Sequence, residues 1–150
     1  MGQQRTNLPP INIPMMLSVT APRPWKKFNT AAPAYLNDLM AVDERMGLWI
    51  RATEAATLTV AGTLPLSPSI ALKAGWNLVG YPSSTTRALP DVLSSVPFSL
   101  VYAYDAFTAG NPWQKFDPNV PPYVNSLNAM TPARGYWIAV GDNAVWTVLK

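Results

Sequence analysis

The feature that most constrains this fold is an internal repeat with a period of 88 residues. When the chain is aligned with itself at that offset, 15 of the 39 pairs from 24/112 to 62/150 are identical. Two of the identical pairs are tryptophans, and a continuous match places residues 47–50 (GLWI) on residues 135–138 (GYWI). Self-similarity at a fixed period predicts that one supersecondary unit is built more than once. We therefore expect a duplicated module.

The two copies differ in length. The second copy has a long lead-in before Trp113, which includes residues 69–82 (SIALKAGWNLVGYP), and the counterpart of that segment would fall before Met1. We expect residues 1–62 to be a partial, back-half copy and residues 63–150 to be a complete module, packed together as one compact body. A longer array, residues 69–82 themselves, or a neighbouring chain are three alternative sources for the missing strands. We favour the first, in which the sequence is a piece of a longer protein.

Alternation of side chains with a period of two recurs throughout the second copy and predicts β-strands. The fold class that we expect is mainly β, an antiparallel β-sandwich or barrel-like body with one or two short helices. The alternating sets are Leu100, Tyr102 and Tyr104, then Tyr136, Ile138 and Val140, and then Val145, Thr147 and Leu149.

Two segments are candidates for the short helices. Residues 83–96 offer hydroxyl side chains as N-caps and apolar side chains at helical spacing before Pro97. Residues 37–46 are the second candidate, but their counterpart contains Pro132, so we expect only one helical turn in both copies.

Composition excludes most catalytic chemistry. The chain contains no cysteine and no histidine, so it has no thiolate or imidazole nucleophile and no Cys/His zinc site. Among its eight carboxylates only one acidic position is shared between the copies, that of Glu54 and Asp142, and neither a Ser-x-x-Lys pair nor a calcium-binding loop of the EF-hand type is present. We expect no enzyme activity, no catalytic residues, no metal site and no cofactor.

Charge and hydropathy limit the kinds of partner that this chain can bind. The net charge is only +3 and the basic residues are scattered, whereas nucleic-acid binding favours a clustered basic stripe, so we expect no nucleic-acid partner. No apolar run is long enough to span a membrane. The apolar segment from residue 8 to residue 22 is interrupted by prolines, and we do not expect it to be a signal peptide.

The aromatic residues allow two interpretations. Large aromatic side chains at repeated positions usually pack in a core, and this interpretation assigns Trp25, Trp49, Trp76 and Trp137 to the core. The alternative is a platform on which sugar rings stack, because exposed aromatic faces with a few polar neighbours suit such ligands. The candidate sugar-stacking residues are those that flank loops, namely Trp113, Tyr123 and Tyr136.

Together, the motifs of the second copy resemble a known kind of module. They are GWNLVGYP (75–82), VYAYD (101–105), PWxKF (112–116), NxL (125–127) and GYWI (135–138). This set resembles the repeated modules at the C-terminal ends of large secreted or surface-attached bacterial and archaeal proteins, whose role is generally uncharacterised.

The resemblance implies an extracellular or cell-surface location and a non-catalytic structural or interaction role, such as adhesion or assembly. The expected partners are other modules or chains, bound through sheet edges, and these include further copies of this chain in a homo-oligomer. The alternative is a carbohydrate-binding accessory domain with a polysaccharide as its partner.

Overall fold

The fold is mainly β, as the sequence predicts. A computed structural model describes residues 12–17, 25–59 and 67–149. All strand pairs in this part of the chain are antiparallel, and its helical segments are single 3₁₀ turns. The segment from residue 8 to 22 and residues 62–69, whose sequence GTLPLSPS predicts a linker between the two copies, lie largely outside the described residues.

Eleven strands and three 3₁₀ turns make up the described elements. In chain order these are β1 (Asn12–Leu17), β2 (Trp25–Asn29), η1 (Ala34–Leu36), β3 (Leu48–Arg51), β4 (Ser69–Leu72), β5 (Gly75–Gly80), β6 (Arg87–Ala88), η2 (Asp91–Leu93), β7 (Phe98–Tyr104), β8 (Trp113–Phe116), η3 (Pro122–Val124), β9 (Ala129–Met130), β10 (Gly135–Val140) and β11 (Ala144–Thr147).

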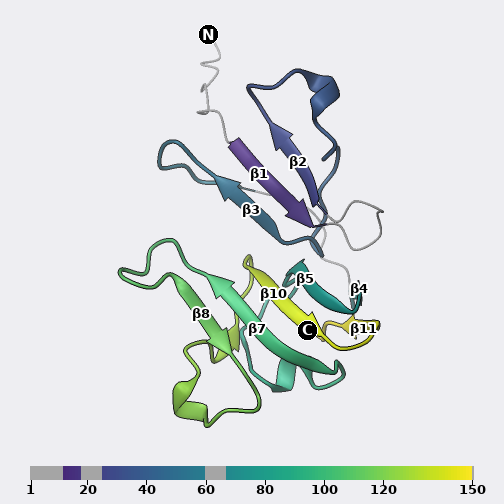
Figure 1. The fold of residues 1–150 in the computed structure, drawn as a ribbon, viewed down its shortest axis with the longest axis vertical. Coiled ribbons are helices and arrows are strands. Elements are labelled where there is room, and N and C mark those ends of the chain that lie inside the picture. The colour runs from purple at the N-terminus through teal and green to yellow at the C-terminus, as the bar shows by residue number, and fades with distance from the viewer. Residues whose placement is uncertain (1–11, 18–24, 60–66, 150) are drawn as a thin grey trace.

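Two larger sheets organise these strands. One is three-stranded with the order β2-β1-β3, and the other is four-stranded with the order β5-β10-β7-β8. Figure 1 shows the first sheet above the second. Two short ladders, β11-β4 and β6-β9, and an isolated antiparallel bridge between Met46 and Val79 complete the pairing in the described part of the chain.

Strand β10 is the centre of the four-stranded sheet, because β5 and β7 pair with its two edges. Its side chains alternate as the sequence predicts: Tyr136, Ile138 and Val140 are buried, and Trp137 and Ala139 are half-buried. Successive side chains of a strand point to opposite faces. The buried set therefore faces the core, and Trp137 lies on the other face of the sheet.

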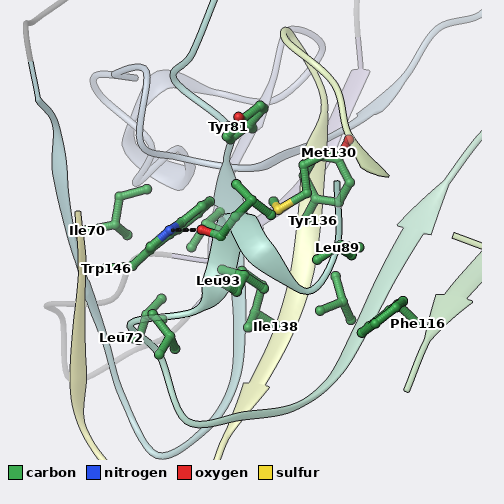
Figure 2. Packing of buried hydrophobic residues seen from close by; sticks show 14 of the residues in the cluster. Ile70, Leu72, Tyr81, Leu89, Leu93, Phe116, Met130, Tyr136, Ile138 and Trp146 are labelled. Atoms are coloured by element: carbon green, nitrogen blue, oxygen red, sulfur yellow. Dashed lines mark hydrogen bonds between the residues drawn. The ribbon is translucent and has the colours of Figure 1, made fainter. Parts of the chain in front are cut away.

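The core lies between the four-stranded sheet and the short elements that cover its inner face, which gives a β-sandwich-like body. Figure 2 shows Trp146 of β11 within the core, on the same side as Ile70 and Leu72, where the indole N–H donates a 3.0 Å hydrogen bond to the carbonyl oxygen of Val92. The ring of Tyr81 stacks on Trp146 with centroids 6.1 Å apart. A buried polar group needs such a partner, so β11 and the turn at η2 are held together by one side chain.

The helix predicted for residues 83–96 is wrong. Residues 87–88 form strand β6, paired with β9, and only Asp91–Leu93 form a 3₁₀ turn. The backbone N–H groups of Leu93 and Val96 bond to carbonyls three residues back, which are those of Pro90 and Leu93. A 3₁₀ turn brings side chains three residues apart to one side, so the apolar spacing that predicts a helix here serves a turn that covers the core.

The single helical turn expected in both copies is present slightly earlier, as η1 and η3, whose bounds differ by 88 residues. An asparagine follows each turn. Asn37 accepts the backbone N–H of Asn29 at 2.8 Å and donates to its carbonyl, and Asn125 makes the same pair of bonds with Asp117, again with a 2.8 Å N–H bond. The identity of these two asparagines therefore has a local cause: each ties the end of a strand to the turn after it.

We predict that Trp146→Ala lowers the free energy of unfolding by roughly 3–5 kcal/mol, because it leaves a cavity and strands the Val92 carbonyl. The matched control is Leu58→Ala, 88 residues earlier, where the side chain is 58% exposed and the effect should stay within about 0.5 kcal/mol. Urea unfolding of both variants measures the difference. Equal losses would contradict this description of the core.

Candidate functional site

The outer face of the four-stranded sheet carries a group of aromatic side chains. Opposite residues of paired strands share a face. The register places Tyr102 opposite Trp137, Trp113 opposite Tyr104, and Trp76 opposite Ala139. All of these residues therefore lie on the same side as Trp137, away from the core.

Four of these rings line an open hollow. Its volume is about 390 Å³, and its described lining consists of Trp76, Tyr102, Trp113 and Trp137. The Tyr102 ring meets Trp113 edge to face at 6.2 Å and lies 5.9 Å from Trp76. Because the rings hold one another in place, the hollow offers a ligand an apolar, preformed surface. We call these four residues the aromatic hollow.

The three-stranded sheet contacts the same face through two reciprocal tryptophan pairs. Trp25 lies 5.3 Å from Trp137, and Trp49 lies 5.7 Å from Trp113. Trp113 lies 88 residues after Trp25, and Trp137 lies 88 residues after Trp49. Each pair therefore joins one tryptophan position in the first sheet to the other position in the second sheet. Such reciprocity is the mark of a two-fold contact.

Glycines make the close approach of the two sheets feasible. A side chain at Gly47 would place its Cβ 2.7 Å from Cγ of Leu78 and 2.9 Å from the backbone nitrogen of Val79. A Cβ on Gly135 would lie 3.5 Å from Cα of Gly47 itself. The two glycines, 88 residues apart, therefore meet where the sheets cross.

The second candidate surface consists of exposed apolar side chains on β2, on β3 and in the segment that follows β3. Three side chains of the first stretch are exposed where their counterparts 88 residues later are buried. Phe28 is 37% exposed against 8% for Phe116, Ile50 is 39% exposed against 0% for Ile138, and Leu58 is 58% exposed against 0% for Trp146. We call Phe28, Ile50 and Leu58 the uncovered face.

The elements that cover Phe116, Ile138 and Trp146 explain this contrast. The apolar cluster around them includes residues of β4, β5 and the η2 turn, all from residues 69–97. The described part of the chain contains no second set of such elements over the three-stranded sheet.

The predicted sugar-stacking residues have different environments. Trp113 is exposed and lines the aromatic hollow, and Tyr123 on η3 is 88% exposed but does not line it. Tyr136 is only 1% exposed, and its hydroxyl oxygen accepts the backbone N–H of Thr131 at 2.7 Å. The expectation that Tyr136 is exposed is wrong, because it stands on the core face of β10.

The predicted core tryptophans are also placed differently. Trp25, Trp49 and Trp137 are half-buried between the two larger sheets, and Trp76 is 48% exposed. The fully buried tryptophan of the described core is Trp146. Trp76 lies on β5, an edge strand of the four-stranded sheet. Tyr102, which lines the hollow, is absent from the predicted set. The alternation of Val101 and Ala103 with Tyr102 was the signal that could have revealed it.

The surroundings of two carboxyl groups lower their pKa. Burial acts to raise the pKa of Asp43, but hydrogen bonds and the charge of Arg45 outweigh it and lower the pKa. The backbone N–H of Phe107 lowers the pKa of Asp105, and Arg134 adds to the effect. Both carboxyl groups are therefore ionised at neutral pH, which is unsuited to a general acid.

No group of three or more His, Cys, Asp or Glu side chains converges within the described ranges. Within the same residues, no helix has the length and hydropathy to cross a membrane. Comparisons with protein-family models, curated proteins and solved structures found no match for this chain. The aromatic hollow and the uncovered face are therefore the two candidate functional surfaces in the described residues.

We predict that Gly47→Ala lowers the free energy of unfolding by roughly 1–3 kcal/mol, because the new methyl group forces the crossing of the sheets apart. Gly141→Ala is the matched control, since a Cβ there meets nothing within 4 Å. Urea unfolding followed by tryptophan fluorescence measures both. A Gly47 variant as stable as the Gly141 variant would contradict the close crossing.

Proposed function

We propose that this chain is a non-catalytic interaction module of a larger extracellular or cell-surface protein, and that it assembles with other modules or chains. The observation that carries the proposal is the uncovered face. Phe28 and Ile50 lie on strands β2 and β3, Leu58 follows β3 outside any strand, and the counterparts of all three pack in the core. Contiguous exposed apolar surface on a folded domain marks an interaction site more often than isolated exposed residues do.

The energetics favour a partner on this face. Full burial of a Leu, Ile or Phe side chain stabilises by roughly 1.5–3 kcal/mol relative to exposure. Three such side chains supply a useful part of the free energy of a specific complex, although association itself costs several kcal/mol. The extracellular location rests on the resemblance of the 75–82 and 135–138 motifs to modules of secreted proteins.

We predict weak self-association of the purified chain, because two uncovered faces can cover each other when no other partner is present. Sedimentation velocity over a range of protein concentrations measures it. The double variant Phe28→Asp/Leu58→Asp should sediment as a monomer, because it places charges on the uncovered face. The control Val145→Asp/Leu149→Asp alters two exposed apolar side chains on β11 and just after it, outside the uncovered face, and should behave as the wild type. A wild-type chain that stays monomeric at every concentration would count against the proposal.

A second candidate function, carbohydrate binding, is favoured by the aromatic hollow. Three tryptophans and one tyrosine line it, and Lys115 lies opposite Tyr102 on the same face of the sheet. Apolar surface with a few polar groups at its edge is the usual composition of a small-ligand site. Trp113 and Trp76 are the members with the most exposed rings.

If the hollow binds sugar, soluble polysaccharides should change the intrinsic tryptophan fluorescence of the chain, and Trp113→Ala should abolish the change. Tyr123→Ala is the control, since Tyr123 is exposed but does not line the hollow. A screen of neutral and acidic polysaccharides provides the measurement. A fluorescence change that survives in Trp113→Ala, or no change with any polysaccharide, would reject this candidate.

A further inference from the structure

The two larger sheets have the same order of strands, except that one lacks a member. The four-stranded sheet reads β8-β7-β10-β5, and the three-stranded sheet reads β2-β1-β3. Strand β2 begins 88 residues before β8, and Leu48–Arg51 of β3 lies 88 residues before residues 136–139 of β10. Strand β2 therefore corresponds to β8, and β3 corresponds to β10, in the order of strands that the two sheets share.

Strand β1 holds the place of β7, as the registers show. Leu17 pairs with Trp25 as Tyr104 pairs with Trp113, and Met15 pairs with Trp49 as Tyr102 pairs with Trp137. The position without an occupant in the described residues is that of β5, on the edge of β3 that faces away from β1.

We propose that this open edge of β3 binds an extended segment of the β5 type, with the pattern Gly-Trp-Asn-Leu-Val-Gly, supplied by another polypeptide segment that carries the front half of such a module. The inference rests on the proposed function and names the partner. Addition of a strand to an exposed sheet edge is a common mode of peptide recognition, with backbone hydrogen bonds for affinity and alternate side chains for specificity.

The pairing of β5 with β10 gives the register of the added strand. In that pair Gly135 lies opposite Gly80, and Trp137 lies opposite Leu78. Subtracting 88 places Gly47 opposite the second glycine of the incoming segment and Trp49 opposite its leucine. A shift by one residue would exchange the two faces of the segment, and it would turn the asparagine and the valine of the pattern away from the uncovered face.

The backbone groups of β3 suit this addition. The N–H of Gly80 donates to the carbonyl oxygen of Arg45 at 2.9 Å, which leaves Gly135 and Gly80 as a pair without mutual hydrogen bonds. The hydrogen-bonded pairs of β10 with β5 are therefore the alternate ones, which include Ile138. By the same alternation, the backbone N–H and C=O of Ile50 point to the open edge.

The surroundings of β10 show that such a strand is compatible with the crossing of the sheets. There, β5 pairs along the whole of β10 while Trp25 packs on Trp137. The contact of Trp113 with Trp49 is the reciprocal of this one, so the same packing can form beside a strand added to β3.

The chemistry of β5 explains why this pattern, and not any strand, is the partner. Asn77 is buried, accepts the N–H of Lys73 at 2.9 Å and donates to the carbonyl oxygens of Lys73, at 2.8 Å, and Ile138, at 3.4 Å. The Asn77 side chain therefore closes the turn between β4 and β5 and also bonds to the neighbouring strand β10. Val79 is fully buried in the core. An incoming asparagine and valine would bond the Ile50 carbonyl and cover the uncovered face in the same way.

The test uses the full chain and a dye-labelled synthetic peptide of residues 67–97, which contains β4, β5 and the η2 turn. Fluorescence anisotropy should report saturable binding, and hydrogen exchange should show increased amide protection at residues 48–51. Because the peptide and a second copy compete for the uncovered face, the peptide should also reduce self-association in sedimentation.

Two substitutions locate the site. Ile50→Lys places a charge on the uncovered face beside the open edge and should weaken peptide binding at least tenfold. Val145→Lys, which changes a β-branched exposed residue on β11, should leave it unchanged. A peptide that carries Val79→Lys should not bind the wild-type chain. Unchanged thermal unfolding of the Ile50 variant shows that it is folded, and the exchange measurement on the wild type does not depend on any variant.

The outcomes separate this inference from the proposed function. Self-association with no peptide binding leaves the proposed function standing and overturns the inference. Peptide binding that survives in Ile50→Lys, or that protects residues other than 48–51, also overturns it. Neither self-association nor peptide binding rejects both. Peptide binding by a chain that also self-associates, lost in Ile50→Lys, supports both.

Discussion

The structure depends on one strand that is covered on both faces and paired on both edges. Strand β10 contributes Tyr136, Ile138 and Val140 to the core, and Trp137 to the contact between the two larger sheets. Its edges are taken by β5 and β7. Displacement of β10 would expose both the core and the aromatic side chains between the two larger sheets. Both parts of the structure therefore depend on this strand.

That double coverage explains where sequence reasoning succeeds and where it fails. Alternation in residues 135–140 correctly separates Tyr136 from Trp137, because opposite faces follow from strand geometry alone. It does not say which face is the core, since both carry large apolar side chains. The exposed ring was therefore expected at Tyr136, and the buried one at Trp137. Only the tertiary arrangement, with η2 and β11 on one side and β2 on the other, decides between them.

Other features lie beyond the sequence for different reasons. The turn at 91–93 has helical spacing, yet pairing of β6 with β9 leaves room for a single 3₁₀ turn only. The match of β1 to β7 is invisible at an offset of 88, because residues 12–17 share no identity with residues 100–105 and the register of β1 shifts along its length. By contrast, the paired asparagines Asn37 and Asn125 are predictable from identity, because each serves the backbone directly.

The reciprocal contact of Trp25 with Trp137 and of Trp113 with Trp49 has a consequence for polymers of such units. A contact that uses the same patch on both sides is closed, because forming it consumes both patches. Units joined in this way form pairs, and the paired face has no free surface with which to bind a third unit. A string of units would therefore be a chain of couples, and any growth from one couple to the next must use a different surface.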